Sequence, residues 1–316
     1  MKISYIAKQY ESQAKSIEKT EKTKYISFSQ FSSFQKCPMY WKLCYIDKLK
    51  EKEDTIHTIF GDAMHTTIQE WIKVVYLETV KKADQMDFKK VLLENIKNAY
   101  AQSVEKMGKH FSTKEELTEF YLDGLAILDY LKKKRTYWFG TKDDELVGIE
   151  VPISAIPDPS RPNLVLVGYL DVVLRNKKTG KVQILDLKTS KKGWTKWDKQ
   201  DETKTSQLIL YKVHFSKQYN VPVEDIDIEY LVLKRKLDED SLYPQKRITG
   251  FTPANGKISQ SRVIKTFQNF IDSCFTTDGE YNRDGTFAAL RGRYDFNCRF
   301  CEFNTQTTIC PPTNRK

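Results

Sequence analysis

Hydrophobic positions change their spacing along the chain near residue 145. Before that point, apolar and aromatic residues recur every three or four positions, which is the spacing of an amphipathic helix. This spacing predicts helices over about 27–45, 56–80, 87–107 and 113–138. Ser27 and Ser29 are good caps for the first of these helices. We therefore expect residues 26–145 to form a helical region.

Beyond residue 145, runs rich in Val, Ile and Leu predict strands, and an amphipathic helix follows the third of them. The expected strands cover 145–156, 163–176, 182–190, 227–236 and 243–252, and the expected helices cover 203–220 and 258–275. Three strands, a helix and a strand in this order indicate an α/β core with a mixed sheet. The predicted organisation is a polar extension (1–25), the helical region (26–145), the α/β core (146–235) and a C-terminal strand, helix and Cys-rich segment (236–316).

Charge adds a candidate partner to this picture. The net charge is +10 and the sequence pI is about 9.0, which suits a polyanion such as DNA. A merely soluble basic protein is the plainer alternative. No apolar run approaches the roughly 18 residues of a membrane helix, and the N-terminus lacks the apolar stretch of a secretory signal. The expected location is the cytoplasm, or the nucleoid or host cytoplasm if a phage encodes the chain.

Two acidic residues stand inside the apolar strands of the predicted core. Asp171 lies in VGYLDVVLRN, and Asp186 lies in QILDLKTS with Lys188 two residues later. Because side chains alternate along a strand, Asp186 and Lys188 share one face. If the two strands are neighbours, the carboxylates converge, and a hard divalent cation such as Mg²⁺ relieves their repulsion. The alternative is a strand end with an ordinary Asp–Lys ion pair.

This D-x-K pattern, with Gly168 preceding Asp171, resembles the PD-(D/E)XK nuclease superfamily and specifically its RecB-like branch. Three further elements match that branch. The segment SFSQFSSFQKCPMYWKLCYI is similar to its opening helix, GDAMHTTIQEW to its G-x-x-x-H helix, and TSQLILYK to its Q-x-x-x-Y element. The residues that carry the last two matches are Gly61, His65, Gln207 and Tyr211.

The resemblance implies a restriction-endonuclease-like mixed sheet flanked by helices, with an inserted N-terminal helical subdomain and a C-terminal Cys-rich segment. It also implies a Mg²⁺ or Mn²⁺ site, a water positioned by Lys188 and a phosphate held by Gln207 and Tyr211. The implied metal ligands are Asp171, Asp186, His65 and the backbone carbonyl of Leu187. Thr66 stands where the family often has an acidic residue, so Glu70, one turn later, is a further candidate near the metal.

The cysteines of the two chain ends form a second candidate site. Cys298 and Cys301 form a C-x-x-C pair that Cys310 follows, and these three leave a tetrahedral metal site incomplete. In iron–sulfur members of the RecB-like branch, a cysteine of the opening helix completes a [4Fe–4S] site, and Cys37 matches its position. Spacing alone equally allows structural zinc. The remaining two cysteines, Cys44 and Cys274, are expected to be buried small residues.

Aromatic and basic residues alternate in KKGWTKWDK, just after the D-x-K strand. Trp194 and Trp197 are candidates for stacking on unpaired bases, with Lys191 and Lys192 at phosphates. The alternative is a surface loop with two packed indoles. The chain has no G-x-x-x-x-G-K-[ST] loop and hence no helicase motor of its own.

The resemblance is to stand-alone exonucleases such as CRISPR-associated adaptation and phage recombination nucleases. It implies DNA that is single-stranded or has free ends, and recombination or replication proteins as partners. Two alternatives come from other functional classes. One is a catalytically silent or zinc-stabilised nucleic-acid-binding module of the same fold, although no acidic or Lys residue of the core motif is missing. The other is a zinc-stabilised RNA-binding protein, for which the sequence has no recognition fingerprint.

Overall fold

The computed structural model describes residues 5–15, 17, 20–50 and 53–316. Its described strands form one seven-stranded mixed sheet in the order β1-β3-β4-β5-β6-β7, with β2 paired to β4 off this path. The pairs β2–β4 and β5–β6 are parallel, and the others are antiparallel. The strands are β1 (Tyr5–Ile6), β2 (Lys24–Ser27), β3 (Asp144–Ala155), β4 (Leu164–Asn176), β5 (Val182–Ser190), β6 (Ile226–Lys234) and β7 (Ile248–Phe251).

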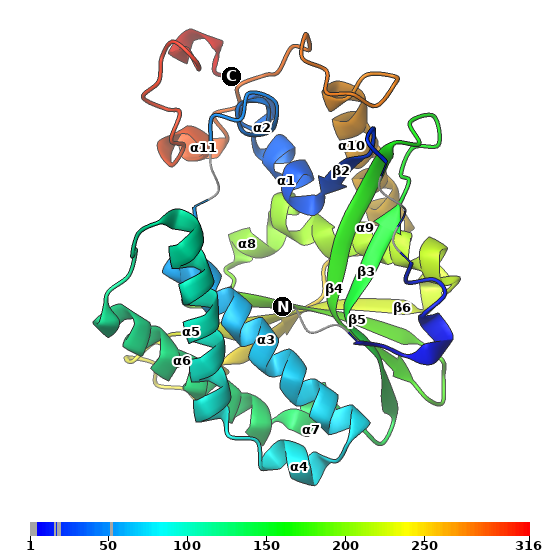
Figure 1. The fold of residues 1–316 in the computed structure, drawn as a ribbon, viewed down its shortest axis with the longest axis vertical. Coiled ribbons are helices and arrows are strands. Elements are labelled where there is room, and N and C mark those ends of the chain that lie inside the picture. The colour runs from blue at the N-terminus through cyan, green and yellow to red at the C-terminus, as the bar shows by residue number, and fades with distance from the viewer. Residues whose placement is uncertain (1–4, 16, 18–19, 51–52) are drawn as a thin grey trace.

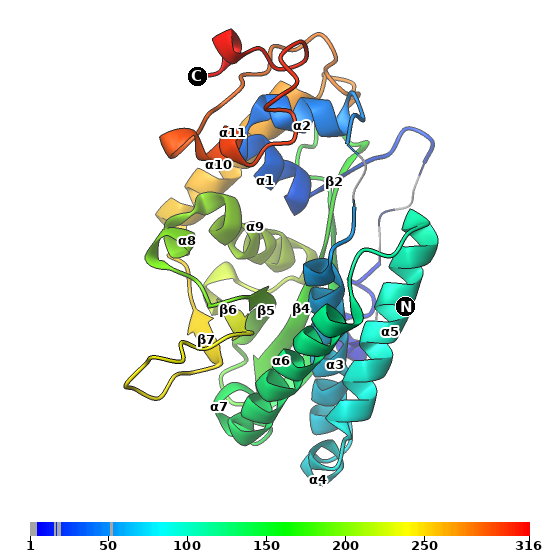
Figure 2. The ribbon, with the colours of Figure 1, turned by 90° about the vertical axis from the view of Figure 1, so that its left-hand side faces the viewer.

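Helices cover both faces of this sheet, as Figures 1 and 2 show. One hydrophobic core joins the sheet to α1, α9 and α10, and the other joins it to α3, α5 and α6. The helices are α1 (Phe28–Lys36), α2 (Pro38–Tyr45), α3 (Ile56–Leu77), α4 (Val80–Asp84), α5 (Phe88–Met107), α6 (Lys114–Lys133), α7 (Arg135–Trp138), α8 (Lys196–Gln200), α9 (Glu202–Tyr219), α10 (Lys257–Cys274) and α11 (Phe296–Arg299). The predicted mixed sheet flanked by helices is confirmed.

The central strands are apolar on both sides because both faces of the sheet are buried. On β3, Ile149 belongs to the core with α3, whereas Val147 and Val151 belong to the core with α9. This arrangement explains why the strands read as nearly continuous apolar runs. The predicted strands agree with the observed ones within a few residues, except that β7 begins at Ile248 and not at residue 243.

The helix expected over 27–45 is wrong as a single element. It breaks at Cys37, whose backbone is extended, and α2 begins with Pro38 at its first position. Proline has no backbone N–H to continue a helical ladder and disfavours helical geometry in the residue before it. Ser27 caps α1 by accepting a hydrogen bond from the Gln30 N–H. The break places Cys37 at a corner between two helices.

The polar N-terminal segment takes part in the sheet. Strand β1 pairs with β3, and β2, at the end of this segment, pairs with β4. The Gln218 side chain of α9 also donates a hydrogen bond to the Gln13 carbonyl. None of the described helices is both long and apolar enough to cross a membrane.

One edge of β4 is interrupted between its two neighbours. Strand β2 pairs with residues Leu164–Val167, and β5 pairs with residues Val172–Arg175 on the same edge. The four residues between these stretches, 168–171, have neither strand beside them there. This is the G-x-x-D segment of the sequence, and the opening beside it holds the candidate site.

Candidate active site

Two buried carboxylates face this opening from adjacent strands. Asp171 lies at the end of the interrupted edge of β4, and Glu150 lies opposite it on β3, between the register pairs Ile149–Val172 and Val151–Leu170. With His65 of α3, they offer ligand atoms that all lie within 4.8 Å of one another. Imidazole nitrogen and carboxylate oxygens are suitable ligands for a divalent metal ion, so the residues present fit such an ion.

Glu150 has an unusual backbone conformation. Its φ is +52°, in the left-handed region that few residues with side chains adopt. Such a conformation costs about 1–3 kcal/mol and is found preferentially at functional sites, where the surroundings enforce it. The sequence analysis did not single out Glu150. Its signal was nevertheless present, because a glutamate between Ile149 and Val151 in an apolar strand is the same kind of anomaly as Asp171.

Helix α3 positions these carboxylates through two residues that lie one turn apart. The Gln69 side chain donates hydrogen bonds to Glu150 Oε1 (2.8 Å) and to the backbone carbonyl of Asp171 (3.2 Å). His65 Nδ1 lies 3.5 Å from Asp171 Oδ2. Gln69 was also missed by the sequence analysis, although its i, i+4 spacing from His65 places both on one helix face.

Glu70, the other candidate on α3, lines a cavity of about 530 Å³ together with His65 and Glu150. Its carboxyl group is half-buried and hydrogen-bonds Asn95 of α5, and burial raises its pKa. Gly61, at the start of the predicted G-x-x-x-H element, lies where α3 approaches the end of β5. A Cβ at Gly61 would lie 3.5 Å from Thr189 Oγ1, which is ordinary van der Waals contact.

Strand β5 brings the D-x-K pair to the same opening. Asp186 is buried, and its Oδ2 lies 2.8 Å from Lys188 Nζ in an ion pair. A carboxylate group has about four lone-pair sites, so Asp186 can bind a cation in addition to Lys188. The backbone N–H of Leu187 donates to Asp171 Oδ2 at 2.7 Å, and this contact joins β5 to β4 beyond their last paired residues.

The charges in this group are strongly coupled. Burial raises the pKa of Asp186 to about 6, and the charge of Asp171 adds to the effect against the opposing influence of Lys188. Burial alone would lower the pKa of Lys188, but Asp186 and Asp171 outweigh it and raise that pKa. Burial and the Lys188 charge lower the pKa of His65, although the backbone of Leu187 hydrogen-bonds its ring. At neutral pH His65 is therefore neutral, Lys188 is cationic and Asp186 is largely ionised.

Helix α9 places the predicted Q-x-x-x-Y residues beside the opening. Tyr211 is buried against Gly168, where an added Cβ would lie 2.5 Å from the Tyr211 hydroxyl oxygen. Gln207 hydrogen-bonds Tyr211 and lines a cavity of about 410 Å³ that Lys188 also lines. Gln207 is thus the member of the pair open to a ligand, and Tyr211 lies behind it. The glycine of G-x-x-D leaves room for this tyrosine.

The two tryptophans after β5 have different surroundings. Trp194 packs on Tyr230 and Phe251, with ring centroids 4.9 Å and 5.8 Å apart. Trp197 on α8 is exposed. Within the described part of the chain, its one aromatic or cation–π contact is with the Arg293 guanidinium. Lys191 and Lys192 are exposed. Of the two indoles, Trp197 is therefore the one accessible to a partner.

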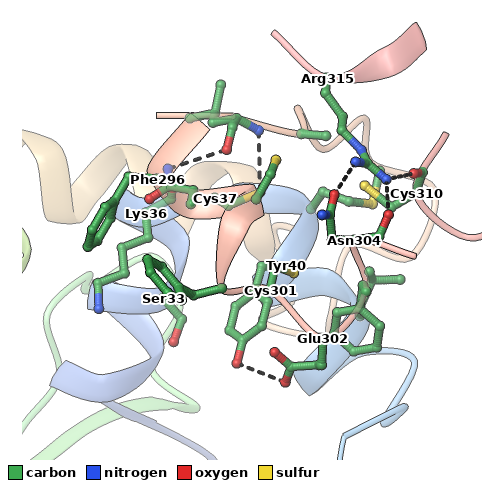
Figure 3. Close-up of a pocket in the computed structure, with 18 of the residues that line it drawn as sticks. Ser33, Lys36, Cys37, Tyr40, Phe296, Cys301, Glu302, Asn304, Cys310 and Arg315 are labelled. Carbon is green, nitrogen blue, oxygen red and sulfur yellow. Dashed lines mark hydrogen bonds between the residues drawn. The ribbon is translucent and has the colours of Figure 1, made fainter. Parts of the chain in front are cut away.

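The four cysteines expected to form a site line one cavity of about 580 Å³ between the chain ends (Figure 3). The Leu290 N–H donates to Cys37 Sγ at 3.3 Å, and the Asn297 side chain donates to the Lys36 carbonyl at 2.7 Å. Among the described residues, no three cysteines bring their sulfurs within 4.8 Å of one another. The structure therefore brings Cys37, Cys298, Cys301 and Cys310 to one cavity but does not show a compact metal-binding group.

The remaining two cysteines differ from each other. Cys274 is buried in the core, as expected. Cys44 is only half-buried and hydrogen-bonds Tyr40, near the cavity of the four cysteines.

Comparison with known proteins adds family information to this geometry. The family model described as the PD-(D/E)XK nuclease superfamily matches residues 25–311. No curated protein matches the chain. Among solved structures, one described as "Putative exonuclease", from Eubacterium rectale, is 15% identical, covers 84% of each chain and has a TM-score of 0.45. The family match spans nearly the whole sequence, and this chain belongs to the PD-(D/E)XK nuclease superfamily.

Proposed function

We propose that the chain is a Mg²⁺- or Mn²⁺-dependent exonuclease of the RecB-like branch that hydrolyses phosphodiester bonds in DNA. The observation that supports this most directly is the convergence of His65, Glu150 and Asp171 beside the Asp186–Lys188 pair. A bound divalent ion would polarise the scissile phosphate and lower the pKa of the attacking water. We add Glu150 to the metal ligands that the sequence implied. The Leu187 carbonyl, next to His65, remains a candidate ligand.

The other residues of the site have separate roles. Lys188 carries a positive charge at the opening, where it can orient the attacking water and stabilise the charge that develops on phosphate. Gln207 faces the same cavity and can hold a neighbouring phosphate oxygen, while Tyr211 fixes its orientation. Gln69 fixes Glu150, as residues hydrogen-bonded to metal ligands commonly do.

The proposal is tested by digestion of end-labelled single- and double-stranded DNA with Mg²⁺, Mn²⁺ or EDTA. Progressive shortening from an end, present with metal and absent with EDTA, is the expected result and reveals the strand preference. Internal cuts without shortening would contradict exonuclease action. DNA binding without any cleavage would support the silent binding module.

Metal affinity should depend on pH through Asp186. A metal ion binds the carboxylate form, so a proton on Asp186 competes with it. Because the pKa of Asp186 is raised to about 6, the apparent affinity should fall as pH drops through about 6, by up to roughly tenfold per pH unit. A proton on His65 competes little with the metal ion near pH 6, because the pKa of His65 is lowered.

Calorimetric titration with Mn²⁺ at several pH values measures this dependence. Asp186→Asn is the matched control, because it removes the titrating group and should flatten the profile around pH 6. Equal Mn²⁺ affinity of the unmodified protein on both sides of pH 6 would contradict the assigned role of Asp186.

We further propose that Cys37, Cys298, Cys301 and Cys310 hold a [4Fe–4S] cluster. The four cysteines line one cavity of about 580 Å³, and thiolates are the usual ligands of such a cluster. Protein purified without oxygen should be brown and contain iron and sulfide, and Cys298→Ser should lose both. Cys44→Ser is the matched control and should keep them. Colourless protein that contains zinc would contradict the cluster.

A further inference from the structure

Four exposed aromatic side chains lie on α8 and on the segment around α11. They belong to Trp197, Tyr294, Phe296 and Phe300, which are 65%, 85%, 66% and 71% exposed. We call this group the aromatic strip. Its members come from segments about a hundred residues apart in sequence, and both ribbon views show α11 above α8 on the same side of the molecule (Figures 1 and 2).

Arginine side chains contact three of the four rings of the aromatic strip. The Arg293 guanidinium lies 5.2 Å from the Trp197 ring and 5.0 Å from the Tyr294 ring. Arg299 lies 5.6 Å from the Phe300 ring. A guanidinium over an aromatic face leaves both groups able to contact a further planar ring or a phosphate. These contacts organise the strip without burying it.

Two cavities lie between the aromatic strip and Lys188, whose ammonium group pairs with Asp186 beside the metal centre. The cavity of about 410 Å³ is lined by Lys188, Gln207, Thr203 and Lys204. The cavity of about 580 Å³ is lined by the same Thr203 and Lys204, and also by Phe296 and Phe300. Because Thr203 and Lys204 of α9 line both cavities, the two cavities are neighbours between Lys188 and the aromatic strip.

The charge along this surface favours an anion. Exposed cationic side chains flank the strip on the loop after β5, on α8 and around α11, and several acidic neighbours are already paired. Asp198 pairs with Lys204, and Asp295 lies 3.5 Å from Arg291. The exposed cations are Lys191, Lys192, Lys196, Lys199, Arg291, Arg293 and Arg299. Alternating cations and exposed rings are the features with which proteins bind phosphates and unstacked bases of a single strand.

We propose that the aromatic strip binds the unpaired strand of the DNA substrate, with bases stacked on Trp197, Tyr294 and Phe300 and the strand passing over Thr203 and Lys204 to the metal centre. The inference rests on the proposed nuclease function and extends it by assigning a path for the strand. It also gives the C-terminal segment a role in substrate binding, besides the proposed cluster.

Equilibrium binding of fluorescein-labelled oligothymidylates of roughly 4 to 16 nucleotides tests this path. The full chain is used in EDTA, so that cleavage does not interfere. The affinity of the unmodified protein should rise with length. Tyr294→Ala and Phe300→Ala should each weaken binding of the longest oligonucleotide by roughly fivefold or more and leave the shortest unchanged. Phe300→Trp should keep the affinity, because an indole stacks as well as a phenyl ring.

Tyr243→Ala is the matched control, because Tyr243 is equally exposed but lies in the loop between β6 and β7. It should bind every length as the unmodified protein does. The inference is overturned if the strip variants bind normally, if blunt duplex loses affinity as much as single strands do, or if the unmodified protein does not bind oligothymidylate. Because no metal is present, a failure to digest DNA would remove the nuclease proposal without affecting this result.

Discussion

Replacement of Lys188 by alanine should lower the rate of DNA cleavage by roughly a hundred- to a thousandfold at saturating Mg²⁺. Its ammonium group lies 2.8 Å from Asp186, at the edge of the group formed by His65, Glu150 and Asp171. There we expect it to stabilise the charge that develops on phosphate only during the reaction. DNA binding should change little, because many other cationic side chains are available to bind the phosphates of the DNA.

Single-turnover cleavage rates and fluorescence anisotropy in Ca²⁺ separate these two effects. Lys181→Ala, with an exposed lysine just before the same strand, is the matched control and should cleave normally. Asp186→Ala should lose at least as much activity as Lys188→Ala, since it removes the partner carboxylate. Undiminished cleavage by either of these variants would refute the assignment of the D-x-K pair.

Replacement of Glu150 by glutamine should lower Mn²⁺ affinity by at least roughly ten- to a hundredfold, and cleavage at limiting metal should fall in parallel. Glutamine has nearly the same shape, and its carbonyl can still accept the hydrogen bond from Gln69. The change therefore removes one negative charge from the ligand group while preserving the local packing.

Calorimetry with Mn²⁺ measures this loss directly. Glu145→Gln is the matched control, because Glu145 lies on the same strand but pairs with Arg175 near the surface. Gln69→Leu should give a smaller loss, since Gln69 acts only through Glu150 and the Asp171 carbonyl. Normal Mn²⁺ affinity in Glu150→Gln would show that this carboxylate does not hold the metal.

Most secondary structure elements could be predicted from the sequence because the apolar spacing reflects which faces are buried. The spacing could not reveal the break at Cys37, since apolar positions continue in helical register through Tyr45. Only Pro38 marked it, through its missing N–H. Spacing also could not show the interrupted edge of β4, because strand pairing is a tertiary property. That interruption is what opens the sheet at Asp171.

The sequence predicted only part of the candidate site, because the approach of Glu150 to Asp171 depends on strand pairing. Asp171, Asp186 and Lys188 were recognisable because charged groups interrupt apolar strands and match a family motif. Glu150 interrupts an apolar strand as clearly but belongs to no motif that the sequence analysis used. Its approach to Asp171 depends on strand pairing and on its left-handed backbone, neither of which can be read from residue types.

The sequence could identify aromatic residues that are candidates for binding bases, but it could not show which of them are exposed. KKGWTKWDK gave no reason to distinguish its two tryptophans, yet one packs on Tyr230 and the other is exposed. The distinction arises from β6 and β7, which supply the rings around Trp194. Likewise, only the fold brings Arg293 from the C-terminal segment to the Trp197 ring.

We propose that a metal ion held between α3, β3 and β4 carries out the cleavage. Anomalous diffraction from crystals soaked in Mn²⁺ tests it most directly, with protein that digests DNA in the same buffer. The expected result is a manganese peak roughly 2 Å from ligand atoms of His65, Glu150 and Asp171, with Asp186 in contact. Active protein whose manganese binds elsewhere, with these four side chains free of metal, would contradict it.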